Sequence, residues 1–402
     1  MWRWWVVVGL ALLRGAWVAV AGSPVVSNDS SRYWNPIDPL SVFRVDVGLG
    51  PGQLVQLVFL ALPPMVAIVV QAVVAGLLWG WAALVVAAGR PGLFWAGVVW
   101  SLSPWWLAWD ARVLTEALML AGLSLFSAGL ARLVSGGGSW VPLLAGLAAA
   151  LLARPLVVVL VAPLMLIGWL SVRRARPLPT LLVGLLVAAA IAQTVVWTSS
   201  VAEHDNLPGP QSVTRIQAQD RFAVRMDVPG YLELARQQGL PACADRVVAM
   251  DANTAVTELR NADGWCPGLA RWLEGGGLPW WRELAFNPLR TARHVLDWHW
   301  PMEQPPDLIA GDLRLAPLGG GLLPTTVVMW LLIAVAAVRL LWPGQRWWPR
   351  FAMAAVCAGF VLATVMADGL EYWRHTLPAF TVLPWLAAGV RLHETTGSGP
   401  KG

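Results

Sequence analysis

Two acidic residues, Asp29 and Asp110, stand at the ends of apolar segments, where a carboxylate is suited to proton transfer. Asp29 lies in the first polar run of the chain, residues 27–33, with the sequence SNDSSRY. An acid just beyond a first membrane helix can reach water-soluble and membrane-borne substrates, and burial and neighbours can tune its pKa. We predict that Asp29 is a catalytic base. The structural alternative is an Asx turn, which Asn, Asp and Ser favour.

Three further polar clusters separate later apolar segments. They are Asp110 with Arg112 and Glu116, Arg154 before a proline, and Glu371 with Arg374 and His375. Ionisable side chains at membrane depth are costly and usually mark a site, and arginine binds phosphate through paired hydrogen bonds. We therefore predict that Asp110 is a second catalytic acid. The predicted substrate-binding residues are Tyr33, Arg112, Glu116, Arg154, Glu371 and Arg374.

These groups also have structural explanations. Asp110 could cap the helix that follows it. The guanidinium groups of Arg112, Arg154 and Arg374 could instead anchor helix ends at the membrane interface by snorkelling.

Metal and nucleotide sites are not apparent in the sequence. The residues His204, His294, His299 and His375 lack metal-ligand spacing on one element, and no Walker motif or glycine-rich nucleotide loop is evident. Two separated carboxylates can position an acceptor without an ion. We therefore predict no cofactor and leave a divalent cation open as an alternative.

The composition is that of a membrane protein. Of 402 residues, 57% are hydrophobic and 13% are charged, and the mean hydropathy is +0.60. Several apolar runs approach the roughly 20 residues that span a bilayer. The net charge of +5 arises from arginines at the ends of apolar runs, so we exclude nucleic acid as a partner and expect membrane lipids. Lysine occurs only at Lys401, a bias typical of GC-rich coding sequences, and we expect a bacterial plasma membrane.

The arginine distribution predicts an all-α polytopic protein with ten transmembrane helices and both termini in the cytoplasm. The predicted spans are 2–22, 64–88, 93–109, 113–130, two short spans within 140–170, 178–197, 322–341, 351–367 and 376–390. The two short spans are hinged at Arg154-Pro155. With two spans here, the arginines before and after them all lie on the cytoplasmic side: Arg132, Arg173, Arg174 and Arg176. Residues 1–22 also resemble a signal peptide, but Arg14 interrupts the apolar stretch and favours a retained helix.

Three parts of the chain follow from these spans. Residues 1–197 form an N-terminal module of seven helices with catalytic outer loops. Residues 198–320 form an extracytoplasmic domain, and residues 321–402 form three helices and a short cytoplasmic tail. Cys243 and Cys266 share the external segment, so we predict that they form a disulfide in an oxidising compartment.

The polar clusters, taken in order, resemble the GT-C superfamily of membrane glycosyltransferases, in the branch of protein O-mannosyltransferases and the lipid A aminoarabinose transferase. The resemblance covers most of residues 1–200 and the last span. The motifs that carry it are Asp29 with Tyr33, the run from Ser103-Pro104 through Asp110 to Leu114-Thr115-Glu116, Arg154-Pro155, Asn287-Pro288, and Arg374 with Pro378.

The resemblance implies an inverting transferase whose donor is a sugar on a lipid phosphate. The first-loop acid is the base and a second-loop acid organises the site, roles that fall on Asp29 and Asp110. Many relatives carry a paired acid in the first loop, whereas Asn28 and Ser30 flank Asp29 here. Asp38 and Asp46 are therefore alternative bases.

Two carboxylates with several arginines suit a reaction in which an acid deprotonates an acceptor hydroxyl and arginines hold a phosphate. We predict a glycosyltransferase that moves a sugar from a polyprenyl phosphate to a glycan, glycolipid or protein on the extracytoplasmic side. One alternative is a lipid flippase or transporter, against which stand the absence of inverted repeats and the charges placed at one face. An inactive assembly subunit is the other alternative.

Overall fold

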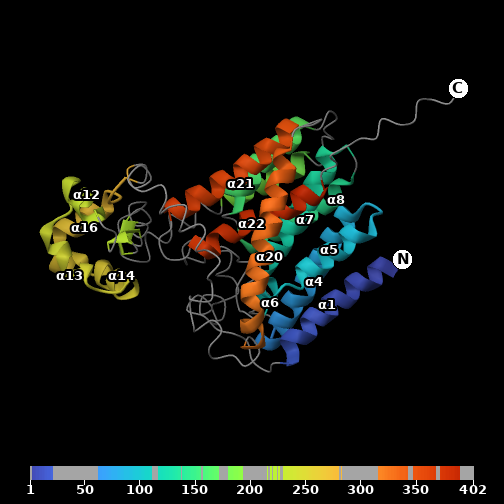
Figure 1. Cartoon of the computed structure of the whole chain (residues 1–402), viewed down its shortest axis with the longest axis horizontal. Helices are drawn as coiled ribbons and strands as arrows, with labels where there is room; N and C mark the ends of the chain where they lie inside the picture. Colours follow the sequence, from blue (N-terminus) through green and yellow to red (C-terminus); the bar gives the residue numbers. More distant parts are fainter. Residues whose placement is uncertain are drawn as a thin grey trace.

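The computed structural model in Figure 1 consists of helices joined by turns and loops. It describes residues 2–20, 62–110, 116–136, 138–154, 157–171, 180–192, 215–279, 282, 316–342, 347–367 and 372–389, with gaps at 216–217, 220, 224 and 227–229. No strand occurs among these residues. The described chain is therefore all-α, as predicted.

The first two described helices, α1 (Trp2–Val20) and α4 (Pro64–Ala87), confirm the helices predicted at 2–22 and 64–88. Helix α4 begins at a proline, which is tolerated in the first turn because its missing N–H would have no partner there. Glycine allows the two helices to approach closely. A Cβ atom on Gly76 would lie 2.6 Å from the Cα of Ala11, so any larger residue would push α1 and α4 apart.

The predicted single helix at 93–109 is instead two helices, α5 (Pro91–Ser101) and α6 (Pro104–Asp110). Proline cannot donate the i to i−4 hydrogen bond, and it disfavours helical geometry in the residue before it. Pro104 therefore ends one helix and opens the next. Because α5 ends at Ser101, its last backbone carbonyl groups have no partner within the helix and can accept hydrogen bonds from other residues.

Helices α7 (Glu116–Val134), α8 (Trp140–Ala153) and α9 (Val158–Ser171) follow. The predicted break at Arg154-Pro155 is confirmed, because α8 ends at Ala153 and α9 starts only at Val158. The hydroxyl of Ser139 caps α8 by accepting a hydrogen bond from the Val141 amide at 3.1 Å.

The C-terminal helices α20 (Ala316–Leu341), α21 (Trp347–Ala367) and α22 (Tyr372–Gly389) complete the bundle. Helix α22 packs against α7, and α21 packs against α9 (Figure 1). The two ends of the chain therefore share one hydrophobic core, which includes Trp79, Phe126 and Leu386.

Four described helices are long and apolar enough to cross a membrane: Trp2–Val20, Pro64–Ala87, Glu116–Val134 and Trp347–Thr364. Shorter apolar helical stretches are Trp140–Ala153, Val158–Ser171, Thr180–Ala192, Trp330–Leu341 within α20 and Leu377–Gly389 within α22. By length and composition, the chain is thus an α-helical membrane protein.

A second group of helices has a hydrophobic core of its own, built around Phe222, Leu259 and Leu269. Its elements are α12 (Tyr231–Gln237), the 3₁₀ helix η5 (Ala242–Ala244), α13 (Asp245–Val248), α14 (Ala252–Arg260), α15 (Ala262–Trp265) and α16 (Pro267–Glu274). The buried side chain of Arg215 pairs with Asp263 at 2.6 Å and with Glu274 at 3.2 Å. The boundary predicted at 320 falls within α20, which begins at Ala316, so the last helical part starts earlier than predicted. The boundary predicted at 198 and the predicted tail after 390 lie outside the described residues.

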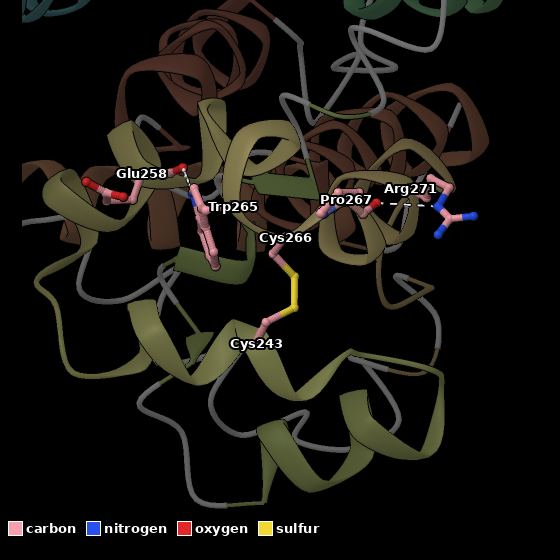
Figure 2. The surroundings of a disulfide bond; sticks show 6 residues. All are labelled: Cys243, Glu258, Trp265, Cys266, Pro267 and Arg271. Carbon is pink, nitrogen blue, oxygen red and sulfur yellow. Dashed lines mark hydrogen bonds between the residues drawn. A yellow bond between two sulfur atoms is a disulfide. The ribbon is translucent and has the colours of Figure 1, made fainter.

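The predicted disulfide is present, since Cys243 and Cys266 are joined with their Cα atoms 6.1 Å apart (Figure 2). It links η5 to the residue between α15 and α16. Next to it, the indole N–H of Trp265 donates to the Glu258 carbonyl at 3.2 Å, and the guanidinium of Arg246 lies 4.8 Å from the Trp265 ring.

Replacing Cys243 with serine is expected to destabilise this helical group by about 3 kcal/mol, the chain-entropy value for a loop of this length. The bridged cysteines are 23 positions apart. The measurement is proteolysis of the 215–279 segment in the full chain as temperature rises. Cys357→Ala is the control, because Cys357 is a free cysteine in α21. Alkylation of both Cys243 and Cys266 without prior reduction would contradict the prediction.

Candidate functional site

The structure describes three of the predicted site residues in full: Asp110, Glu116 and Arg154. Arg374 lies in α22, but its side chain is outside the described part of the structure. The other predicted residues, Asp29, Tyr33, Arg112 and Glu371, also lie outside it, so their roles stay predictions.

Asp110, the last residue of α6, forms a buried ion pair with Arg14 of α1. The Nε of Arg14 donates to one carboxylate oxygen at 2.7 Å, and its Nη2 donates to the other at 2.8 Å. The relative exposures of the two side chains are 0% for Asp110 and 1% for Arg14. Both oxygens of the acid are therefore engaged by one guanidinium group, in the two-bond geometry that arginine favours.

Arg14 also donates from Nη1 to the Ser101 carbonyl oxygen at 2.5 Å. Ser101 is the last residue of α5, where carbonyl groups lack helical partners and carry the negative end of the helix dipole. One guanidinium thus stabilises the C-terminal ends of both α5 and α6. The break at Pro104 creates these two ends, and Arg14 holds them together.

The Arg14–Asp110 pair lies inside the bundle. The Cδ of Arg14 is 3.1 Å from the position of a Cβ on Gly76, which is midway along the 24 residues of α4. The expectation that Asp110 presents its charge at an outer turn is therefore corrected. The physical reason is the break after Ser101, which shortens α5 and brings the end of α6 to the level of Arg14.

Arg14 was not predicted as a site residue, although the sequence carries a signal for it. A charge within an apolar span is costly unless it has a partner, and Arg14 sits in the middle of the first span. Three of the four polar clusters contain an acid that could have been the partner. The pairing with Asp110, 96 positions away, could not be derived from spacing on one element.

Aromatic packing fixes α6 in the bundle. The ring of Trp106 lies 5.5 Å from Trp79 of α4 and 5.4 Å from Trp100 of α5, and Trp79 lies 5.9 Å from Trp385 of α22. Aromatic pairs at these centroid distances contribute beyond the area that they bury. Helices α4 and α5 directly, and α22 through Trp79, thus position the segment that ends in Asp110.

A second ion pair joins Glu116 and Arg154, which belong to two different polar clusters of the sequence. Nη1 of Arg154 donates to Oε1 of Glu116 at 2.5 Å. Glu116 is the first residue of α7, at the positive end of its dipole, and Arg154 is the C-cap of α8, at the negative end of its dipole. Each charge therefore also interacts favourably with the dipole of its own helix. The side chain of Glu116 is fully buried, whereas 16% of the Arg154 side chain is exposed.

The two pairs differ in what they offer to a ligand. Asp110 is sealed by Arg14 and acts as a positioning group in this structure. Arg154 is held by a buried carboxylate but keeps part of its surface exposed, as a residue that binds an anion requires. In the described part of the chain, no group of three or more His, Cys, Asp or Glu residues could hold a metal ion.

No protein-family model matches the chain, and no curated protein or solved structure matches it either.

Proposed function

We propose that the protein is a membrane glycosyltransferase of the GT-C type, which moves a sugar from a polyprenyl phosphate to an acceptor at the extracytoplasmic face. The observation that carries the proposal is the Glu116–Arg154 pair. A partly exposed guanidinium held rigidly at the junction of two helices in an apolar bundle suits the phosphate of a lipid-borne donor. The order of motifs from Asp29 to Arg374 is the second support.

The proposed reaction is a single displacement at the anomeric carbon. Asp29 removes the proton from the acceptor hydroxyl, whose oxygen attacks that carbon while the bond to the donor phosphate breaks. Polyprenyl phosphate leaves with both electrons of that bond, and its charge is offset by Arg154 together with Arg112 or Arg374.

The remaining predicted residues have supporting roles in this proposal. Tyr33 and Glu371 contact the sugar or the acceptor. Asp110, through Arg14, positions the segment that leads into Glu116. A divalent cation is not required by this scheme, since arginines neutralise the leaving group.

We further propose that the shorter helices also cross the membrane, so that the chain has ten spans with both termini in the cytoplasm. Reporters fused within 205–300 are then expected to be external, and reporters after Arg132, Arg176 and Arg391 are expected to be cytoplasmic. Reporter enzymes that are active on only one side of the membrane provide the measurement. An external reporter at 176 would refute two spans within 140–170.

The direct test incubates the purified protein with a panel of polyprenyl phosphate sugars and measures release of polyprenyl phosphate. Arg154→Gln is expected to weaken donor binding by about ten- to a hundredfold, the value of a hydrogen bond to a charged group. Arg132→Gln is the matched control, because it removes an arginine from the last turn of the same α7 helix that Glu116 begins. Equal donor affinity in the two variants would show that Arg154 does not bind the donor.

If no sugar in the panel leads to release of polyprenyl phosphate, the result would favour the inactive assembly subunit or the flippase. The sealed Arg14–Asp110 pair is the observation that supports a subunit without catalysis, because a carboxylate with both oxygens engaged serves structure. A reconstituted protein that moves labelled lipid between leaflets, with no release of polyprenyl phosphate, would support the flippase.

A further inference from the structure

The two cysteines of the disulfide differ in their exposure to solvent. Cys266 belongs to the hydrophobic core of the second helical group and has a relative exposure of 2%. Cys243 is exposed, in the three-residue helix η5, and its neighbour Ala242 is exposed as well. The bond drawn in Figure 2 therefore joins a residue at the surface to a residue in the core.

Backbone hydrogen bonds fix Cys266 between α15 and α16. Its N–H donates to the carbonyl oxygen of Ala262 at 2.7 Å, and its own carbonyl oxygen accepts from the amides of Leu269 at 2.9 Å and Ala270 at 3.2 Å. Leu269 and Ala270 are buried in the same core. A reagent reaches the Cys266 side chain only when this junction opens, and local opening has a free-energy cost.

The turn that carries Cys243 is held in place by contacts other than the disulfide. Ala244 and Val247, which follow Cys243, are fully buried in the core. Pro241 packs on the first turn of α16, since a Cβ atom added to Gly268 would lie 3.6 Å from the Cβ of Pro241. The Cα atoms of the two cysteines are 6.1 Å apart. We therefore expect the reduced helical group to keep its two thiols close together.

Thiol–disulfide exchange requires access to the reacting sulfur atom, because a thiolate attacks a disulfide sulfur directly and forms a mixed disulfide. An external oxidant meets this requirement at the exposed Cys243 and not at the buried Cys266. Disulfides persist in oxidising compartments, which agrees with the external location proposed for this segment.

We propose that Cys243 is the site of thiol–disulfide exchange with an external oxidant that carries a reactive disulfide, and that Cys266 is the resolving cysteine. In the first step, the Cys243 thiolate attacks one sulfur of the oxidant, and the other oxidant sulfur leaves as a thiolate. In the second step, the Cys266 thiolate attacks the Cys243 sulfur of the mixed disulfide, and the second oxidant sulfur leaves. The two cysteines lose two protons and two electrons, and the oxidant disulfide is reduced to two thiols. This exchange goes beyond the proposed glycosyl transfer and does not depend on it.

The test traps the mixed disulfide in the full chain, in a Cys357→Ala background that removes the remaining cysteine. Cys266→Ala leaves Cys243 without its resolving partner, so a mixed disulfide is expected to accumulate on Cys243. Cys243→Ala is the matched variant, and its buried Cys266 is expected to react at least about tenfold more slowly. The oxidants are oxidised glutathione and a thioredoxin-fold protein in its disulfide form. Their relative rates at Cys243 distinguish a low-mass oxidant from a protein.

A second measurement uses the parent chain, because loss of the bond in either variant also affects folding. The parent is reduced without denaturant and labelled with a maleimide over time, and a second sample is reoxidised with oxidised glutathione and quenched with acid. Peptide mass spectrometry is expected to find both the label and the mixed disulfide on Cys243 before Cys266. Equal rates at the two cysteines would overturn the proposal, and so would a mixed disulfide found mainly on Cys266.

Discussion

Replacing Arg14 with methionine is expected to destabilise the protein by about 3–5 kcal/mol, the usual effect of leaving one member of a buried ion pair without its partner. Methionine has nearly the length of arginine and fills the space beside Gly76. It donates no hydrogen bond to Asp110 or to the Ser101 carbonyl. The carboxylate must then be protonated or drawn toward water, either of which loosens α6 from α1.

The stability of these variants can be followed by the thermal midpoint and elution profile in detergent. Arg3→Met on the same helix is the control, because Arg3 makes an exposed hydrogen bond to the Gly89 carbonyl, and it is expected to cost less than about 1 kcal/mol. The double variant Arg14→Met/Asp110→Leu is expected to recover most of the loss, since replacing both charges leaves neither one unpaired. A double variant as unstable as Arg14→Met alone would show that the pair does not act as a unit.

Asp29→Asn is expected to lower turnover by roughly a hundredfold or more while donor affinity stays near that of the parent. Asparagine cannot take up the acceptor proton, but it preserves the size of the side chain and its capacity for a turn. The contacts proposed for the donor phosphate lie on other residues, so its binding should persist. The measurement compares kcat with the Kd for a polyprenyl phosphate sugar.

Two matched variants separate the base from the other acids of the first outer segment. Asp38→Asn and Asp46→Asn are expected to keep parental turnover if Asp29 is the base. Correct folding of Asp29→Asn must be shown first, because an Asx turn at this position would give lost stability with a fully active surviving fraction. A folded Asp29→Asn protein with parental turnover would falsify the assignment, and Asp46 would be the next candidate.

The structure also affects which acid is the better candidate for the base. Both oxygens of Asp110 accept hydrogen bonds from Arg14, and the side chain is fully buried. A general base needs an oxygen within hydrogen-bond reach of the acceptor proton. Catalysis by Asp110 would therefore require Arg14 to withdraw, whereas its role as an organiser of the segment before Glu116 requires no change.

Local sequence determined the helices and several of their ends. Apolar runs of sufficient length predicted α1, α4 and α7, and Arg154-Pro155 predicted the break between α8 and α9. These features depend on propensity, on hydropathy and on the missing N–H of proline, which act within a few residues. The disulfide followed from two cysteines in one polar segment, which limits the pairing to a single choice.

Tertiary structure decided which charges meet. The sequence indicated that Arg14 needs a partner, because a charge in an apolar span is costly, but several acids satisfied that need equally well. The break at Pro104 brings Asp110 to Arg14, and packing of α7 on α8 brings Glu116 to Arg154. Ion pairs and charge clusters form between segments far apart in the chain, so only the packed bundle selects them.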